Sequence, residues 1–389
     1  MQFIDLQAQQ QRIIEKIQGN IDAVLKHGKY IMGPEVEQLE KTLCEYVGAK
    51  YAIACASGTD ALLLALMAKG VGRGDAIFTT PFTFIATAEV ICLLGAVPVF
   101  VDIDPETFNI SPQNLELAIK SVISKDRKIY PLPSTNHAQQ PDIIPRGIIV
   151  VDLFGLPAEY EKINSIASKY GLFVIEDAAQ SFGAEYKGKK ACNLAEICCT
   201  SFFPAKPLGC YGDGGMCFTN DDSLAQTMES LRVHGKGKDK YDNVRIGING
   251  RIDTLQAAIL LAKFEIFAEE VELRQKIAAR YTDILTKMNN GIKAPAVPRG
   301  CKSVWAQYSL LAHSQNHRKE IQARLKENGI PTAVYYPTPL HLQTAFNSFY
   351  NGEEEFPISE DYSKRIFSLP MHPYLKAEEQ AKIIGLLAE

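Results

Sequence analysis

Short apolar runs alternate with helical patterns through the first half of the chain, and this alternation constrains the fold more than any other feature. Because each run is brief and bounded by polar or turn residues, it is typical of a buried strand. Strands separated by helices form a mostly parallel sheet with helices on both faces, which is an α/β fold. Ligands of such sheets bind beyond the carboxyl ends of the strands. The expected strands are residues 51–55, 76–80, 97–102, 147–152, 172–176 and 198–203.

The length of 389 residues exceeds one average domain and is typical of two. A long helical pattern runs from residue 254 to about residue 288, and it predicts a helix that leads from one domain into the next. We therefore expect a large domain at residues 1–264 and a smaller C-terminal α+β domain at residues 265–389.

Other segments are predicted within these two domains. A helix is expected at residues 34–47, where a proline stands in the first turn and a glycine follows the end. In the smaller domain we expect a strand at residues 304–311 and a helix at residues 318–328. An N-terminal arm and a polar, proline-rich surface excursion at residues 124–146 complete the large domain.

Composition excludes several classes of protein. The net charge of −4 gives no electrostatic reason to expect nucleic acid as a partner. No apolar stretch reaches the roughly 18 residues that a membrane span needs, and the N-terminus lacks the pattern of a signal peptide. The nine cysteines lie mostly in apolar runs, which is typical of reduced thiols in a cytoplasmic protein. Their spacing matches no zinc pattern, so no metal site is expected.

One lysine and one carboxylate suggest the chemistry. Lys206 lies between Pro204 and Pro207 in an otherwise apolar segment, and Asp177 ends an apolar run 29 residues earlier. Such a pair suits pyridoxal phosphate, because the amine forms a Schiff base with the aldehyde and the carboxylate keeps the pyridine nitrogen protonated. The plain alternatives are a solvated surface lysine and an aspartate that caps a helix.

Neighbouring residues add possible contacts for the same cofactor. The segment from Ser57 to Asp60 joins a strand to a helix start, where free N–H groups bind anions such as a phosphate, although an ordinary capped helix looks the same. Ser201 is either a phosphate donor or a residue paired within the sheet. Gln180 reaches the phenolic oxygen of the cofactor or lies on the surface. An aromatic ring after the second expected strand, at residue 82 or 84, stacks on the pyridine or packs in the core.

Several motifs together resemble those of the DegT family of sugar-nucleotide aminotransferases, which have the aspartate-aminotransferase fold. The resemblance runs from about Phe3 to Pro373. The stretches that carry it are Gly33-Pro-Glu-Val36, Ala56-Ser-Gly-Thr-Asp-Ala-Leu62, Pro81-Phe-Thr-Phe-Ile-Ala-Thr-Ala-Glu89, Glu176-Asp-Ala-Ala-Gln-Ser181, Ser201-Phe-Phe-Pro-Ala-Lys-Pro-Leu-Gly-Cys-Tyr-Gly-Asp-Gly-Gly215 and Gly247-Ile-Asn-Gly-Arg-Ile-Asp253.

The resemblance implies a role for each cofactor contact and an active homodimer whose sites are shared between chains. By the family pattern, a lysine forms the Schiff base, and an aspartate and a glutamine contact the ring. Glycine, threonine and serine hold the phosphate, an aromatic ring stacks on the pyridine, and an asparagine reaches the neighbouring subunit's cofactor. In this chain the matching residues are Lys206, Asp177, Gln180, Gly58, Thr59, Ser201, Phe84 and Asn249.

The resemblance also implies a substrate. The branch most similar to this chain moves an amino group, expected from glutamate, to C3 of a UDP-linked 3-keto-N-acetylglucosaminuronate for bacterial surface polysaccharides such as the lipopolysaccharide O-antigen. Arg251 is the candidate for the sugar carboxylate, since a guanidinium binds carboxylate through two hydrogen bonds, and Tyr336 and His341 are candidates for the sugar pocket. The alternatives are C4 amination of a UDP- or dTDP-4-keto-6-deoxy sugar, and a regulatory protein that binds the cofactor without turnover.

Overall fold

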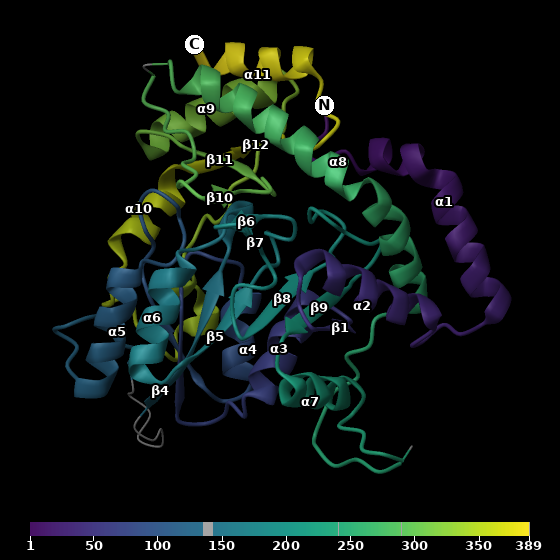
Figure 1. The fold of residues 1–389 in the computed structure, drawn as a ribbon. Coiled ribbons are helices and arrows are strands. Elements are labelled where there is room, and N and C mark those ends of the chain that lie inside the picture. Colours follow the sequence, from purple (N-terminus) through teal and green to yellow (C-terminus); the bar gives the residue numbers. More distant parts are fainter. Residues whose placement is uncertain (135–142, 240, 289, 389) are drawn as a thin grey trace.

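The computed structural model describes residues 1–134, 143–239, 241–288 and 290–388, and its centre is a seven-stranded sheet (Figure 1). All neighbouring strands are parallel except β9, which is antiparallel to both of its neighbours. The predicted α/β fold with a mostly parallel sheet is therefore confirmed. In spatial order the strands are β1 (Tyr51–Cys55), β9 (Gly215–Thr219), β8 (Ile197–Ser201), β5 (Phe173–Asp177), β4 (Ile144–Val151), β2 (Asp75–Thr79) and β3 (Val97–Phe100).

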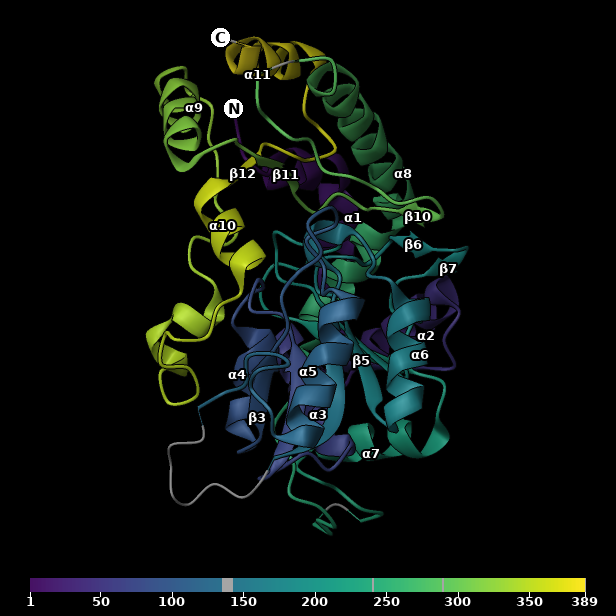
Figure 2. The same ribbon diagram turned by 90° about the vertical axis from the view of Figure 1, so that its left-hand side faces the viewer.

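Helices cover both faces of this sheet because side chains alternate along each strand. On one face, Ile149 and Ile175 pack under α3 (Gly58–Ala68), α4 (Ala86–Leu93) and α7 (Asp222–Arg232). On the other face, Val150 and Val174 pack under α5 (Pro112–Ser124) and α6 (Tyr160–Tyr170), which lie side by side in Figure 2. The strands around β9 on that second face are covered by α2 (Pro34–Val47) and the first half of α8 (Thr254–Leu285).

The long helix α8 connects the sheet to the C-terminal part of the chain (Figure 1). Its second half packs with α9 (Gln315–Glu327) and α11 (Ala377–Ala388) over a small antiparallel pair, β11 (Tyr308–Leu311) and β12 (Ile366–Leu369). The N-terminal segment forms α1 (Leu6–His27), which packs along α8 through Ile17. Because α8 passes residue 264 without interruption, the predicted domain boundary there stays a prediction.

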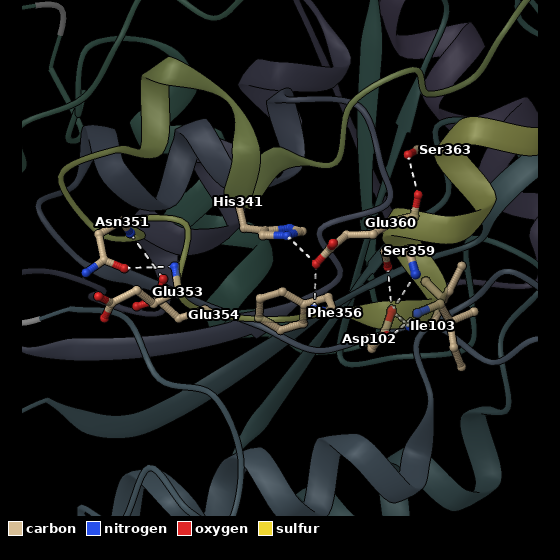
Figure 3. Close-up of polar contacts among 11 residues, drawn as sticks. Asp102, Ile103, His341, Asn351, Glu353, Glu354, Phe356, Ser359, Glu360 and Ser363 are labelled. Carbon is tan, nitrogen blue, oxygen red and sulfur yellow. Dashed lines mark hydrogen bonds and ion pairs between the residues drawn. The ribbon is translucent and has the colours of Figure 1, made fainter. Parts of the chain in front are cut away.

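A buried carboxylate joins the C-terminal part to the end of β3. Asp102 accepts hydrogen bonds from the N–H groups of Ile358 and Ser359, both at 2.9 Å, and from the Ser359 hydroxyl at 2.6 Å (Figure 3). These donors begin α10 (Pro357–Arg365), whose free N–H groups favour a negative charge. Asp102 therefore caps α10 from a distant part of the chain.

The remaining elements are short. They are β6 (Glu185–Tyr186), β7 (Lys189–Lys190) and β10 (Cys301–Lys302), which form a second small sheet, and the 3₁₀ turns η1 (Leu153–Gly155), η2 (Leu340–Leu342) and η3 (Thr344–Phe346). Within the described ranges, no helix combines the length and the apolar character that crossing a membrane requires.

Two local predictions differ from the structure. The strand expected at 304–311 is confined to β11, because residues 303–306 instead form hydrogen bonds to η1 and to side chains of α8. The excursion expected at 124–146 is partly wrong, since Tyr130 and Leu132 are buried in the core and residues from Ile144 onward belong to β4. Residues 135–142 of that segment lie outside the described part of the chain.

Candidate active site

The carboxyl edge of the sheet brings the predicted cofactor residues together. Asp177 and Ser201 are the last residues of the adjacent strands β5 and β8. Gly58 begins α3 shortly after β1, which lies on the other side of β9. Parallel strands end at the same edge, so residues separated by more than a hundred positions become neighbours there.

Asp177 is buried at this edge with two hydrogen-bond donors. Its Oδ2 accepts from the Thr87 hydroxyl at 2.8 Å, and its Oδ1 accepts from the Ala179 N–H at 3.2 Å. Burial raises the pKa of the carboxyl group above its ordinary value, whereas these donors and the positive charge of Lys206 oppose that rise. A buried carboxylate of this kind is stabilised further by a cationic partner, which a protonated pyridine nitrogen supplies.

Lys206 lies in a compact turn after β8. Its N–H donates to the Phe203 carbonyl at 2.8 Å, which folds the chain back just before the second proline. The side chain keeps partial access to solvent, yet the surrounding protein is dense enough that burial lowers the pKa of the ammonium, with Asp177 partly opposing. A lower pKa leaves more of the amine neutral, and the neutral amine is the nucleophile that forms a Schiff base.

The start of α3 forms a close-packed cradle beside Ser201. A Cβ atom at Gly58 would lie 2.6 Å from the Ser201 Cβ atom, so only glycine fits at this approach. The Ser57 hydroxyl already accepts the Asp60 N–H at 3.0 Å and caps the helix. The N-terminal N–H groups of α3 and the hydroxyls of Thr59 and Ser201 therefore remain as candidate phosphate donors.

The two aromatic candidates after β2 have opposite environments. Phe82 is fully buried, at 0% exposure, in the cluster beneath the C-terminal part, whereas Phe84 is 56% exposed. Of the two rings, Phe84 is the one that has a free surface on which a flat ligand can stack. Together with the glycine cradle and the buried Asp177, this exposed ring means that the residues present fit a phosphorylated pyridine.

Gln180 is held in one orientation by its neighbours. Its Oε1 accepts the Phe154 N–H at 2.6 Å, so its Nε2 faces the other way and donates to the Tyr336 hydroxyl at 3.2 Å. Burial raises the pKa of Tyr336, and the phenol therefore stays protonated near neutral pH. Gln180 thus links the turn after β4 to Tyr336 from the C-terminal part of the chain, which places Tyr336 with the cofactor residues.

His341 is not brought to this group. Its side chain is 0% exposed, its ring lies 4.6 Å from that of Phe356, and its Nε2 is 3.2 Å from Oε1 of Glu360 (Figure 3). A side chain enclosed by α10 in this way lines no open pocket. The predicted contact of His341 with a sugar therefore does not fit its placement.

Asn249 and Arg251 lie together on an exposed segment. The Arg251 Nε donates to Asn249 Oδ1 at 2.9 Å, and the described residues contain no ion pair between Arg251 and Asp253. Gly250, between the two, accepts the Ala56 N–H at 3.0 Å. The pair therefore lies beside the segment that leads into the α3 cradle.

Two contacts of the candidate site residues were not predicted from the sequence, namely the Thr87 hydroxyl on Asp177 and the Phe154 N–H on Gln180. Thr87 lies within a motif that carries the family resemblance. Thr83 lies four residues before it, and the two hydroxyl oxygens are 3.1 Å apart. This i, i+4 pair of threonines is the one signal in the sequence that points to the first contact. The Phe154 contact has no such signal, because it depends on a backbone group.

This sheet edge combines a lysine of lowered pKa, a buried carboxylate and a helix start that can bind a phosphate. Together these features define the class of site that binds a phosphorylated aldehyde cofactor. The chain belongs to the DegT/DnrJ/EryC1/StrS aminotransferase family, whose model matches residues 11–388. It is 51% identical over 96% of both chains to the UDP-2-acetamido-2-deoxy-3-oxo-D-glucuronate aminotransferase of Pseudomonas aeruginosa.

Two further similarities bear on function. The pleiotropic regulatory protein of Geobacillus stearothermophilus is 43% identical over 100% of this chain and 97% of its own length. The crystal structure of DesV from S. venezuelae, in complex with a ketimine intermediate, matches with a TM-score of 0.90 and 30% identity over 100% of this chain and 97% of that chain.

Proposed function

We propose that this chain is a pyridoxal-phosphate-dependent aminotransferase that moves an amino group from glutamate to C3 of UDP-3-keto-N-acetylglucosaminuronate. The placement of Lys206, with its lowered pKa, near the buried Asp177 is the observation that carries this proposal. The identity to the P. aeruginosa aminotransferase over nearly the whole chain supports the choice of substrate. We extend the proposal to a cytoplasmic role in bacterial surface polysaccharide synthesis, such as that of the O-antigen.

The residues at the sheet edge divide the work of holding the cofactor. The start of α3, with Gly58 and Thr59, and the hydroxyl of Ser201 bind the phosphate. Phe84 would hold the ring by stacking, and Asp177 would bind its nitrogen. Gln180 approaches the phenolic oxygen, since its Nε2 retains a second hydrogen after donating to the Tyr336 hydroxyl.

Once bound, pyridoxal phosphate supplies an electron sink that acidifies the proton on the α-carbon of the amino donor. Lys206 then acts as the general base that accepts this proton, and its lowered pKa increases the fraction that is neutral. Asp177 is ionised when a positive ring nitrogen faces it, and the Thr87 hydroxyl fixes its orientation. The same groups serve both halves of the transfer.

Arg251 and Asn249 are proposed to act across a homodimer. Asn249 reaches the cofactor phosphate of the partner, and Arg251 binds the sugar carboxylate in that same site because the two side chains are hydrogen-bonded to each other. Exposed apolar side chains support a partner surface, since they gather at residues 30–32 and on the segment that holds Val244 and Ile246. Shared sites require the dimer for activity.

The experiment loads the pyridoxamine phosphate form and offers a panel of keto nucleotide sugars. Conversion of the UDP-3-keto-uronate, with recovery of the absorbance of the lysine-bound cofactor, is the expected result. Conversion of only 4-keto-6-deoxy sugars would replace the substrate assignment, and conversion of none, with no bleaching by glutamate, would support the regulatory alternative.

Arg251→Ala tests the carboxylate contact within the same panel. We expect it to weaken the uronate far more than a neutral 3-keto sugar, and Arg251→Lys to restore little because lysine lacks the planar fork. Arg299→Ala, which removes an exposed arginine from another part of the chain, is the control. Equal losses for the charged and neutral sugars reject the assignment.

A further inference from the structure

The buried side of α8 carries a row of polar residues beneath the Lys206 turn. Gln256, Lys263 and Glu270 recur at intervals of seven residues, which is two helical turns and therefore one side of the helix. Lys263 is only 1% exposed and Glu270 only 2%, although charged residues are rarely buried without a partner. We call these three residues the polar row of α8.

Each member of the polar row contacts a different segment. Gln256 accepts the Tyr211 N–H at 2.9 Å through its Oε1. The Lys263 Nζ lies 4.8 Å from the centroid of the Tyr211 ring. Glu270 accepts hydrogen bonds from Gln9 of α1 and from the Tyr374 hydroxyl. Two of the three members therefore hold the same tyrosine.

Lys263 is unusual because its charge has no conventional partner. Among the described residues, no oxygen accepts a hydrogen bond from its Nζ, and no carboxylate forms an ion pair with it. The carboxylate of Glu270, two turns along the helix, raises the pKa of Lys263 through its charge, but burial lowers that pKa by more. The face of the Tyr211 ring is thus the group that stabilises the buried ammonium, as a cation–π contact.

Tyr211 directly follows the turn that contains Lys206. The Cys210 N–H donates to the Phe202 carbonyl at 2.7 Å, which closes this turn. A Cβ atom at Gly209 would lie 2.6 Å from the carbonyl oxygens of Phe203 and Pro204, so the turn is tightly packed. A movement of Tyr211 is therefore transmitted to the turn that carries Lys206.

We propose that Lys263 is a positioning residue for the transfer reaction, which holds the Lys206 turn in place through the face of Tyr211. This inference rests on the proposed role of Lys206. Lys263 touches neither cofactor nor substrate, and it acts only through Tyr211. Gln256 fixes the backbone of the same residue, so the two contacts restrain both the position and the tilt of the ring.

The first test measures amide hydrogen exchange in the apoprotein, over peptides that cover residues 202–212. We expect Lys263→Met to increase exchange there about tenfold, and Lys263→Arg to restore it because a guanidinium also binds an aromatic face. The matched control is Lys287→Met, which removes an exposed lysine that lies just after the end of α8. Exchange unchanged by Lys263→Met, or equally increased by Lys287→Met, overturns the proposal.

The second test is a double-mutant cycle with Tyr211. Tyr211→Leu removes the ring and should increase exchange as Lys263→Met does, whereas Tyr211→Phe keeps the ring and should not. The double variant should be no worse than either single variant, and additive effects contradict the proposed contact. In holoenzyme we expect kcat to fall in Lys263→Met with KM for the amino donor unchanged, and a fall in affinity alone contradicts a positioning role.

These readouts separate this inference from the proposed function. The exchange measurement is made without cofactor, so it reports the restraint of the turn whether or not Lys206 forms the Schiff base. Altered exchange combined with a Schiff base on another lysine would support the positioning role of Lys263 and reject the proposed role of Lys206. Normal exchange combined with a Schiff base on Lys206 would do the reverse.

Discussion

Replacing Thr87 by valine tests how the buried carboxylate of Asp177 is kept ionised. Valine has nearly the shape of threonine but no hydroxyl, so it removes the 2.8 Å hydrogen bond to Asp177 Oδ2 together with the 3.1 Å hydrogen bond between the Thr83 and Thr87 hydroxyls. A hydrogen bond to a charged group contributes about 1.5–3 kcal/mol, which corresponds to about one to two pKa units. Because burial already raises the pKa of Asp177, the loss of this donor raises it further.

The consequence is a pH-dependent loss of cofactor binding. An ionised Asp177 binds a protonated ring nitrogen, so that contribution exists above the pKa of Asp177 and disappears as the pH falls through it. In Thr87→Val the acid limb of cofactor affinity should move upward by about one to two pH units. Titration of apoprotein with pyridoxal phosphate, followed by absorbance across a pH series, measures both the affinity and this limb.

Two further threonines give graded controls. Thr200→Val removes a buried hydroxyl from β8 that donates to the Ala178 carbonyl at 2.9 Å, so it perturbs packing without touching the carboxylate. Thr83→Val should have a smaller effect of the same sign. The single hydroxyl hydrogen of Thr87 is directed to Asp177, so Thr83 donates to Thr87 rather than the reverse. A Thr87→Val profile that coincides with wild type or with Thr200→Val refutes this reasoning.

Two other predictions concern the cradle and the polar row. Gly58→Ala places a methyl group 2.6 Å from the Ser201 Cβ atom and should weaken binding of inorganic phosphate and of cofactor about tenfold or more, as calorimetry can measure, and unchanged binding argues against the cradle. Burial lowers the pKa of Lys263 from 10.5 to about 8. Between these pH values the unfolded chain binds a proton that the folded chain has released. The free energy of unfolding therefore rises with pH, by up to about 3 kcal/mol. Urea unfolding from pH 7 to 10 should show that this rise is absent in Lys263→Met, and an identical pH dependence in both proteins contradicts it.

The sheet and its binding edge could be predicted because they follow from local patterns. Each apolar run is long enough for one buried strand, and the carboxylate of Asp177 and the serine at 201 stand where their runs end. Parallel order then brings those ends together without further information. Strand β9 (Gly215–Thr219) is not among the expected strands, and its antiparallel course has no signal of its own, since the residue pattern of a buried strand is the same in both directions.

The details that the sequence did not reveal depend on distant packing. His341 lies in a proline-rich turn that suits a pocket, but Phe356 and Glu360 fold back over it and enclose the ring. Tyr130 lies in a polar segment, yet its hydroxyl accepts the Asp102 N–H at 2.8 Å and its ring is buried. Such contacts join residues far apart in the chain, and no periodicity or spacing encodes them.

The most direct measurement is reduction of the holoprotein with borohydride, followed by peptide mapping. We predict that the reduced cofactor is found on the Nζ atom of Lys206, and that Lys206→Ala carries no label and has no transfer activity. Lys263 is the informative comparison, because burial also lowers the pKa of its ammonium. Label on Lys263 or any other lysine, or on none, would contradict the assignment of this site.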